Sequence, residues 1–583
     1  MFLQRFRRTA LAISGAALVA ACSSGTGDSA SGGGAGTGTG GAGGDPSTAG
    51  APSVLVTAPA TKSDSARFLT QASFGPNAAE IDKVTASGYT AWLDEQFAKE
   101  PAQTHTAFYD ERYAANNNQN SADYVYHSFW KNALAGDDQL GQRVAFALSQ
   151  IFVVSLVDGN VSQYPRGVAS YLDMLRRNAF GNFRTLLQDV TLHPMMGLYL
   201  SHMKNQGQGT RVPDENYARE VMQLFTVGLY ELNEDGTVKT GADGAKLETY
   251  TNDDVTGLAK VFTGWSWSGP DTTDEYFRGT TTVRNREILP MEAYESYHAK
   301  GQKNFLKASC PSGTQAAQSL QCGLDILFNH PNVGPFVGRQ LIQRLATSNP
   351  SPAYVRRVAA VFANNGNGVR GDLKAVIRAI LLDPEARNAP SATDTRAGKV
   401  REPVLRMAAM FRAVSATSVT GRFQIGNTDD VGNSLGQTVM RSPSVFNFYR
   451  PGYVPPNSDL SAASLVAPEL QTTNETSIAG YLNTMQNAVQ NGYGSAPSNQ
   501  TDVKSAYAEE IALAHNADAL LDRIDLVLMA GQMNPSTRQR IRDVVNSITI
   551  SAVNATAAAT ARRNRVLVAM FLAVASPEFI APK

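Results

Sequence analysis

The sequence has 583 residues, of which 51 are basic, 51 are acidic and 43% are hydrophobic. This balance shows none of the basic excess that marks nucleic-acid-binding proteins, so we expect no nucleic-acid partner. The length exceeds the roughly 250–300 residues that one hydrophobic core usually serves. We therefore expect two packed subdomains.

The N-terminal end has the pattern of a secretory signal peptide. Arg5, Arg7 and Arg8 form a positive segment, and an apolar run over 10–21 follows it. This run is shorter than the roughly 20 apolar residues that a membrane-spanning helix needs. Residues 1–21 are therefore expected to direct export and to be removed.

The end of this segment has the order of a bacterial lipobox, a branched residue and two small residues before a cysteine: Val19, Ala20, Ala21 and Cys22. The Cys22 thiol can carry a lipid, so we expect a lipoprotein that is anchored in a membrane through this residue. Ser23 comes next and, by resemblance to other Gram-negative lipoproteins, favours the outer membrane. The alternative is ordinary signal cleavage, with Cys22 incidental.

A stretch rich in Gly, Ser, Thr and Ala covers the residues 22–62. It has almost no charged or aromatic side chains, so it cannot bury enough apolar surface to fold by itself. We interpret it as a flexible linker between the lipid and a body that spans 63–583.

The apolar residues of the body recur mostly at helical spacing, which predicts a mainly α fold. The segment 232–251 is instead typical of a β-hairpin or paired loops, because two Asp-Gly pairs separate its short alternating runs. The loop-rich residues 415–475 mark a possible subdivision, and Asn534 with Pro535 predicts a late helix start. The clearest helices are predicted over 141–156, 195–203, 255–262, 336–346, 353–363, 373–382 and 404–414.

Two His and three Met side chains occur together over 193–203. If Pro194 begins a helix, His202 shares one helix face with Met195, and such a set suits a soft metal such as copper. Methionines at helical spacing are more often core residues, and His193 is well placed as a helix cap. We therefore assign no metal site.

The segment 213–228 carries the strongest candidates for catalysis. Pro213 and the acids after it predict the start of a helix, on which Glu215 and Arg219 lie four residues apart and can pair. Glu220 flanks the apolar stripe of this helix and is expected to be half-buried. A carboxylate of this kind near an arginine is either a tuned acid or base, with His193 brought close, or part of a structural ion pair.

Two aromatic stretches occur at 262–267 and 446–453. Exposed aromatic rings stack on sugars, whereas buried ones fill the core between irregular loops, and the second interpretation is favoured.

Cys310 and Cys322 are the only cysteines after the lipobox, and they flank a polar loop. We expect them to form a disulfide in an oxidising compartment, which stabilises the fold by roughly 3 kcal/mol in the chain-entropy model. The alternatives are two separate thiols or an incomplete metal pair.

Five ordered segments make the chain resemble the bacterial domain-of-unknown-function family 1800 over roughly 63–580. They are 66–76, 213–228, 261–265, 330–333 and 442–448. The resemblance implies a large exported bacterial protein with no established activity and no assigned catalytic residue. It also implies a gene that often lies beside one for an exported protein of domain-of-unknown-function family 1501, which is a candidate partner.

These observations leave three functional interpretations open. The first is a lipid-anchored cell-envelope protein that acts in a surface or periplasmic assembly. The second is an envelope hydrolase that uses carboxylates near Glu215 and Glu220, with polysaccharide as its candidate substrate. The third is a soft-metal protein built on His193 and His202. No phosphate-binding loop, haem-attachment motif or paired Cys-x-x-Cys occurs, so we expect no cofactor.

The lipobox interpretation predicts that Cys22→Ser abolishes lipid attachment, because serine has no thiol to form the thioether. Metabolic labelling with a radioactive or clickable fatty acid should mark the wild-type protein and not the variant, and fractionation should find the variant released from membranes. Labelling that persists in Cys22→Ser would refute the interpretation.

Overall fold

The computed structural model describes residues 55–391 and 394–583. The chain is mainly helical, as predicted, and the signal segment, Cys22 and most of the linker lie outside the described residues. The N-terminal helices are α2 (Lys62–Ala72), α3 (Ala78–Ala98), α4 (His105–Ala115), α5 (Asp123–Ala135), α6 (Gln139–Ser149), α7 (Pro165–Asn178), α8 (Phe183–Leu192) and α9 (Pro194–Tyr199).

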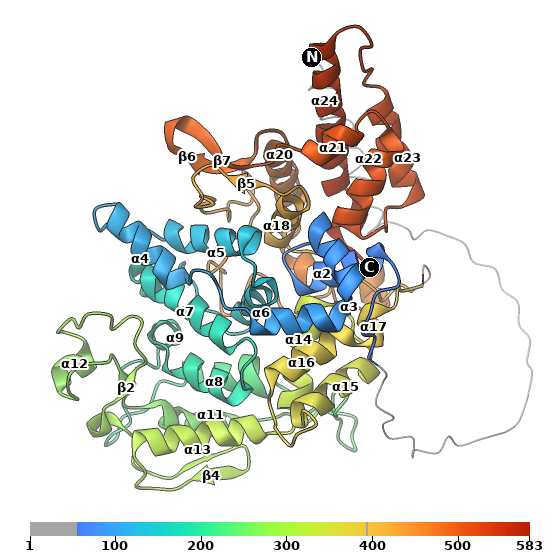
Figure 1. Ribbon diagram of the computed structural model, residues 1–583. Helices are drawn as coiled ribbons and strands as arrows, with labels where there is room; N and C mark the ends of the chain where they lie inside the picture. The colour runs from blue at the N-terminus through green and yellow to red at the C-terminus, as the bar shows by residue number, and fades with distance from the viewer. Residues whose placement is uncertain (1–54, 392–393) are drawn as a thin grey trace, which may run out of the picture.

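The remaining helices complete the body, and small sheets are inserted among them (Figure 1). The central helices are α10 (Asn216–Glu220), α11 (Asn252–Ala259), α12 (Asp274–Arg278), α13 (Ala316–Asn329), α14 (Val333–Leu345), α15 (Pro352–Ala363), α16 (Leu373–Leu382), α17 (Pro384–Arg387) and α18 (Pro403–Ala413). The C-terminal helices are α19 (Asp459–Ala462), α20 (Glu475–Asn491), α21 (Ala508–Leu513), α22 (Ala517–Ile524), α23 (Pro535–Asn546), α24 (Ala555–Val574) and α25 (Pro577–Ile580).

Local capping residues explain where many of these helices begin. Thr61 and Asp64 form a reciprocal capping box at the start of α2, which satisfies backbone amides that have no partner inside the helix. The predicted helix start at Asn534 is confirmed, because its side chain accepts a hydrogen bond from the Ser536 amide and Pro535 occupies the first turn of α23.

The helix predicted over 141–156 is wrong in its second half, since α6 ends at Ser149. The residues that follow are buried but bond to a distant loop instead of continuing the helix. The Leu156 amide donates to the Met440 carbonyl at 2.8 Å, and the Ser155 hydroxyl donates to the Ser442 carbonyl at 2.7 Å. Long-range hydrogen bonds thus replace the helical ones here.

The strands are short and antiparallel. They form a two-stranded sheet of β1 (Trp265–Ser266) and β2 (Glu292–Ala293), a second of β3 (Lys303–Phe305) and β4 (Ala308–Cys310), and a third in the order β5 (Thr417–Ser418), β7 (Gln500–Lys504), β6 (Tyr493–Ala496). The segment 232–251 forms paired loops, as predicted, through the isolated antiparallel bridges Leu232 to Val238 and Thr240 to Lys246.

The expected disulfide between Cys310 and Cys322 is present, with a Cα–Cα distance of 5.9 Å. It joins β4 to α13 across 12 residues of sequence. The β3–β4 hairpin is therefore fixed covalently to the helix that packs beside it.

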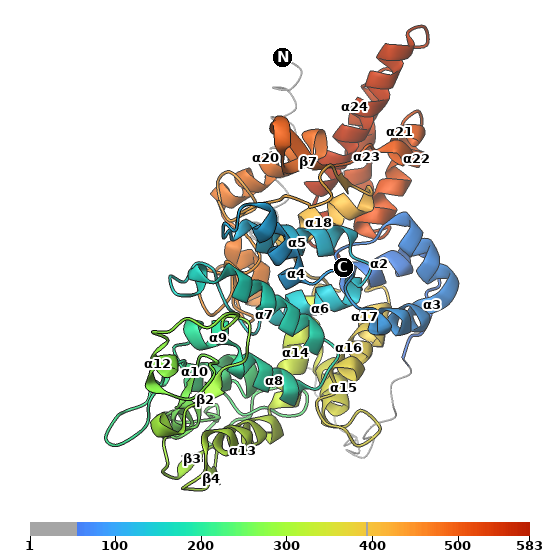
Figure 2. The ribbon, with the colours of Figure 1, turned by 60° about the vertical axis from the view of Figure 1, so that its left-hand side comes forward.

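The buried apolar side chains form one main cluster that runs from Ala66 to Phe579. Figures 1 and 2 show α21–α24 at one end of the molecule and α13 and β4 at the opposite end, where Figure 1 also shows α11. A subdivision near 415–475 stays a prediction.

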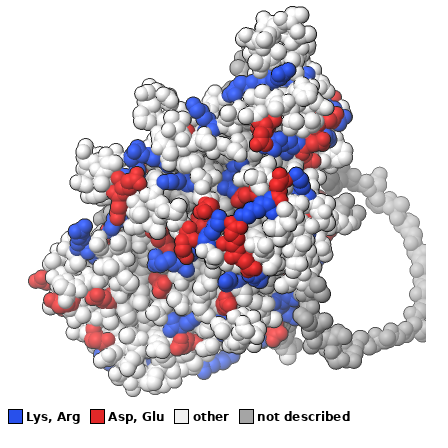
Figure 3. Space-filling model, viewed as in Figure 1, with Lys and Arg blue, Asp and Glu red and all other residues white. Residues whose placement is uncertain are grey.

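Among the described helices, none is long and apolar enough to cross a membrane. Basic and acidic side chains are interspersed over the face that Figure 3 shows.

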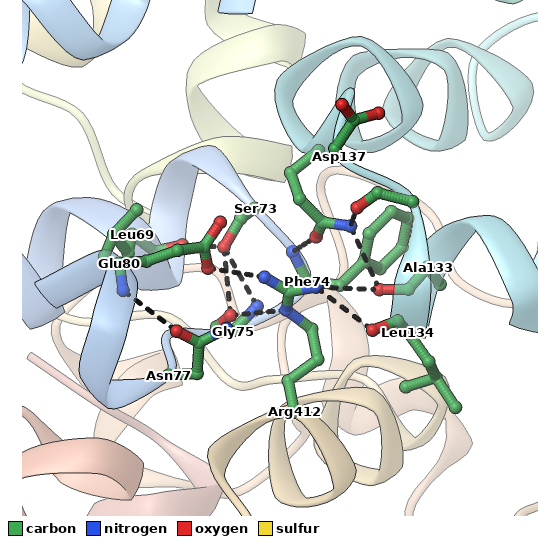
Figure 4. A network of polar contacts seen from close by, with 12 residues as sticks. Leu69, Ser73, Phe74, Gly75, Asn77, Glu80, Ala133, Leu134, Asp137 and Arg412 are labelled. Carbon is green, nitrogen blue, oxygen red and sulfur yellow. Dashed lines mark hydrogen bonds and ion pairs between the residues drawn. The ribbon is translucent and has the colours of Figure 1, made fainter. Parts of the chain in front are cut away.

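A buried corner joins α2 and α3 to α5 and α18 (Figure 4). The Arg412 guanidinium donates to the carbonyl of Gly75 at 2.7 Å, to that of Leu134 at 3.3 Å and to the Glu80 carboxylate at 2.5 Å. Gly75 has a φ of +129°, and a Cβ atom there would lie 2.6 Å from the Cα atom of Ala409. Glycine is thus required for α18 to approach this corner.

Gly75→Ala is expected to destabilise the fold by about 1–3 kcal/mol, because the added methyl group overlaps the α18 backbone. Thermal unfolding followed by circular dichroism should show a lower Tm. Gly159→Ala is the matched control, since a Cβ at Gly159 meets nothing within 4 Å. Equal melting temperatures for the two variants would contradict the packing argument.

Candidate functional site

The segment predicted as one helix from Pro213 begins its helix later, at Asn216. The backbone of Asp214 is bonded to Asn205 instead: its amide donates to Asn205 Oδ1 at 2.8 Å, and its carbonyl accepts from Asn205 Nδ2 at 2.9 Å. The Asp214 side chain accepts from the Asn216 amide at 2.8 Å. α10 therefore begins directly after a turn at Asp214 that hydrogen bonds to Asn205 hold in place.

A π-helix over Val221–Thr226 continues α10. The Val227 amide donates to the Met222 carbonyl, five residues earlier, at 2.9 Å. Phe225 is fully buried on one side of this turn, whereas Gln223 and Leu224 face a cleft on the other. Such π turns are rare and occur often at functional sites.

Glu215 and Arg219 form the predicted pair, with 3.4 Å between Oε2 and Nη2. Both side chains are partly exposed, and Glu215 Oε1 accepts a further hydrogen bond of 2.7 Å from the Thr256 hydroxyl. An exposed pair of this kind contributes little to stability, typically less than about 1 kcal/mol. The pair links α10 to α11.

Glu220 is half-buried, as predicted, and its Oε2 atom has no hydrogen-bond partner. Burial raises the pKa of its carboxyl, and the nearby positive charge of Arg219 opposes that shift. Arg219 forms its ion pair with Glu215 and not with Glu220. Glu220 thus combines burial with a raised pKa, which is typical of a tuned acid, although its catalytic role stays a prediction.

The contacts of His193 are with α9 and Tyr171 rather than with these carboxylates. It caps α9, where its Nδ1 atom accepts from the Met195 amide at 3.3 Å, and its ring packs edge-on against Tyr171 at 5.0 Å between centroids. Burial, with a smaller effect of the Arg177 charge, lowers the pKa of His193 to about 3. The imidazole is therefore neutral at physiological pH, and the capping role expected of it is present.

His202 follows the end of α9 and is buried against Tyr217, with the two rings stacked at 3.9 Å. Its Nε2 atom lies 2.8 Å from the Thr191 carbonyl, and burial lowers its pKa to about 4. Within the described residues, no group of three or more His, Cys, Asp or Glu side chains is arranged to hold a metal ion.

A large cleft, about 830 Å³, lies between α14, the π-helix, the paired loops and the loop 445–454. Asn332 fixes the paired loops to α14: its Nδ2 atom donates to the carbonyls of Val227 and Tyr230 at 2.8 Å, and its Oδ1 atom accepts from the Leu232 amide at 2.9 Å. Gly228 lets the π-helix meet α14, since a Cβ there would lie 2.7 Å from the Phe336 ring.

Three arginines line the cleft, and its lining contains no Asp, Glu or His. Arg339 forms no ion pair with any described residue; its side chain is exposed, and the protein atoms around it lower its pKa through partial desolvation. Arg344 is 5% exposed and donates to the carbonyls of Gln150 at 3.0 Å and Gln340 at 3.2 Å. The Arg450 guanidinium lies 4.5 Å from the centre of the Phe446 ring. The cleft is therefore electropositive.

The rest of the lining combines aromatic rings with amides. Figure 1 helps to locate α14, from which Phe336 and Gln340 contribute to one wall. The aromatic side chains are Tyr230, Phe336, Phe446 and Tyr453, and the amide side chains are Gln150, Gln223, Gln340, Gln343 and Gln471. By contrast, Trp265 and Trp267 of the other aromatic stretch are buried. The stretch 262–267 thus fills the core, whereas the stretch 446–453 borders the cleft.

None of Glu215, Arg219, Glu220 and His193 lines this cleft. The sequence indicated the segment 213–228 and the aromatic stretch 446–453, parts of which line the cleft. It did not indicate Arg339, because a single arginine on an amphipathic helix resembles any solvent-facing residue. The only available indication was that Arg339 has no acidic side chain three or four residues away on the predicted helix.

Comparison with known proteins identifies a family. A family model described as "Protein of unknown function (DUF1800)" matches residues 67–581. The match agrees with the extent expected from the sequence, roughly 63–580. No curated protein and no solved structure matches the chain.

Glu220→Gln is expected to raise the Tm at pH 7 relative to wild type, because the raised pKa means that ionised Glu220 opposes folding. This penalty is absent below the ordinary glutamate pKa of about 4.3 and grows as pH rises through the folded-state value. Melting curves of both proteins at pH 4 and pH 7 measure the difference. Glu100→Gln, at an exposed position, is the control, and a lower Tm for Glu220→Gln at pH 7 would favour a structural ion pair.

Proposed function

The chain belongs to the DUF1800 family of proteins of unknown function, and we propose that it is an exported, lipid-anchored protein of the bacterial cell envelope that binds an acidic polysaccharide. Cys22 is the proposed anchor, and the outer membrane is the proposed location. An assembly with an exported family 1501 protein stays a prediction.

The observation that carries the proposal is the surplus of arginine in the cleft. Arg339, Arg344 and Arg450 have no acidic neighbour in the lining. A guanidinium presents a planar fork of N–H donors that matches a carboxylate, sulfate or phosphate group. The cleft therefore favours a ligand that carries negative charge.

The aromatic and amide side chains supply the contacts that a sugar chain needs. Phe336 and Tyr453 line the cleft with aromatic rings, and Gln223 and Gln471 contribute amide groups, which can hydrogen-bond to hydroxyl groups. Sugar rings stack their apolar faces on aromatic side chains and hydrogen-bond through their hydroxyl groups. A volume of about 830 Å³ leaves room for several sugar units.

Binding is favoured over hydrolysis at this cleft. Most glycoside hydrolases use a pair of carboxyl groups about 5–10 Å apart on either side of the scissile bond, and the cleft lining supplies none. Glu220 retains a raised pKa, but it is not part of the lining. A hydrolase that uses Glu215 and Glu220 is therefore the second interpretation.

The double substitution Arg339→Ala with Arg450→Ala is expected to weaken binding of polygalacturonate by at least about tenfold, because each charge-assisted contact contributes about 1.5–3 kcal/mol. Isothermal titration calorimetry on the purified protein at low and moderate salt measures the loss. Arg540→Ala, at an exposed position far along the chain in α23, should bind as wild type does. Equal affinity of wild type for neutral dextran, or no loss in the double variant, would contradict the proposal.

A further inference from the structure

A second, smaller cavity lies at the C-terminal end of α14, bounded by α2, α6 and the start of α18. Its volume is about 40 Å³. Its lining contains five cationic residues and no Asp or Glu side chain; the cations are Arg67, Arg143, Lys399, Arg401 and Lys583. The chain thus encloses a small space with positive charge on several sides.

Arg143 projects from α6 and is 1% exposed. Its Nη2 atom donates to the carbonyl of Arg344 at 2.6 Å. Its Nε and Nη1 atoms are buried and have no hydrogen-bond partner in the described part of the chain. One guanidinium edge is therefore anchored, while the other donors have nothing to bind.

Arg401 repeats this arrangement from the segment before α18. It is 5% exposed, its Nη2 atom donates to the Leu528 carbonyl at 3.2 Å, and its Nε and Nη1 atoms have no partner among the described residues. Burial lowers its pKa to about 10, so the side chain is still charged at neutral pH.

The acidic side chains nearby form other contacts. Glu469 pairs with Lys399 through Oε1, while its buried Oε2 atom has no hydrogen-bond partner among the described residues, and Asp64 pairs with Arg67 at 3.3 Å. Glu402 Oε2 accepts from the amides of Gln150 at 2.6 Å and Gln437 at 2.5 Å. Neither Arg143 nor Arg401 forms an ion pair within the described residues, so both charges lack a direct counter-ion.

Leaving buried donors unpaired is costly, at about 1–3 kcal/mol for each group and more when the group is charged. The cavity is larger than the roughly 10–15 Å³ that one water molecule needs. We propose that it is a binding site for a small inorganic oxyanion, phosphate or sulfate, held by the free N–H groups of Arg143 and Arg401. A tetrahedral oxyanion offers oxygen atoms to both guanidinium groups at once.

The ligand has a route from the surface. A neighbouring pocket of about 400 Å³ shares Arg67, Gln71, Ala346 and Lys583 with the cavity lining. The bound oxyanion would join α2, α6 and the segment before α18, and it would stabilise the folded state in proportion to the logarithm of its concentration above the Kd.

The experiment compares melting temperatures of purified protein after dialysis into chloride, with phosphate, sulfate or extra chloride added at matched ionic strength. It is performed on the Arg339→Ala, Arg450→Ala background, so that the cleft does not contribute. We expect the Tm to rise with phosphate or sulfate and to saturate, and not to rise with chloride. Arg143→Gln and Arg401→Gln should each lose the rise, and Arg562→Gln, at an exposed position, should keep it.

A measurement without variants covers the case in which the arginine substitutions prevent folding. Ion chromatography of native protein, denatured after dialysis into chloride, should release about one oxyanion per chain and shows whether it is phosphate or sulfate. The proposal is overturned if no oxyanion is released and no anion-specific rise in Tm occurs, or if chloride raises the Tm equally.

Discussion

Arginines that donate to the carbonyl groups at the ends of other helices hold this helical body together. The last carbonyls of a helix have no partner inside it and carry partial negative charge. α6 and α14 exchange hydrogen bonds of this kind. Arg143 of α6 donates to the Arg344 carbonyl in the last turn of α14, and Arg344 donates to the Gln150 carbonyl at the end of α6. Arg412 does the same for the end of α5. Each of these contacts joins the end of one helix to the side of another, so they hold neighbouring helices together.

The position of the cleft depends on the hydrogen bonds between α6 and α14. α14 is held against α6 at its C-terminal end, and at its N-terminal end Asn332 holds the paired loops through three backbone hydrogen bonds. The wall between these two fixed points carries Phe336 and Arg339. Arg344 both donates to the end of α6 and lines the cleft. The positive charge of the site and the stability of the fold therefore depend partly on the same side chain.

The sequence predicted what local spacing determines. The helix at 373–382 has its predicted bounds, the bond between Cys310 and Cys322 forms, and Glu215 pairs with Arg219. It failed where distant segments compete for the backbone. α6 ends at Ser149, and beyond it Leu156 and Ser155 bond to the loop at Met440 and Ser442 instead of extending the helix. His193 packs against Tyr171, a contact that local spacing does not indicate. Arg339 belongs to the cleft only because the paired loops and the loop 445–454 fold opposite α14. The residue pattern of one helix cannot indicate such a contact.

The π-helix makes the cleft sensitive to chain length as well as to residue identity. A turn closed five residues back encloses one residue more than an α-helical turn, so the side chains after Met222 are rotated relative to those before it. Deleting a single residue here would restore a regular helix and turn Gln223 and Leu224 away from α14, even with every remaining residue unchanged. Relatives that differ by one residue in this turn would thus present a different surface to a ligand, and substitution-based comparison would not detect the change.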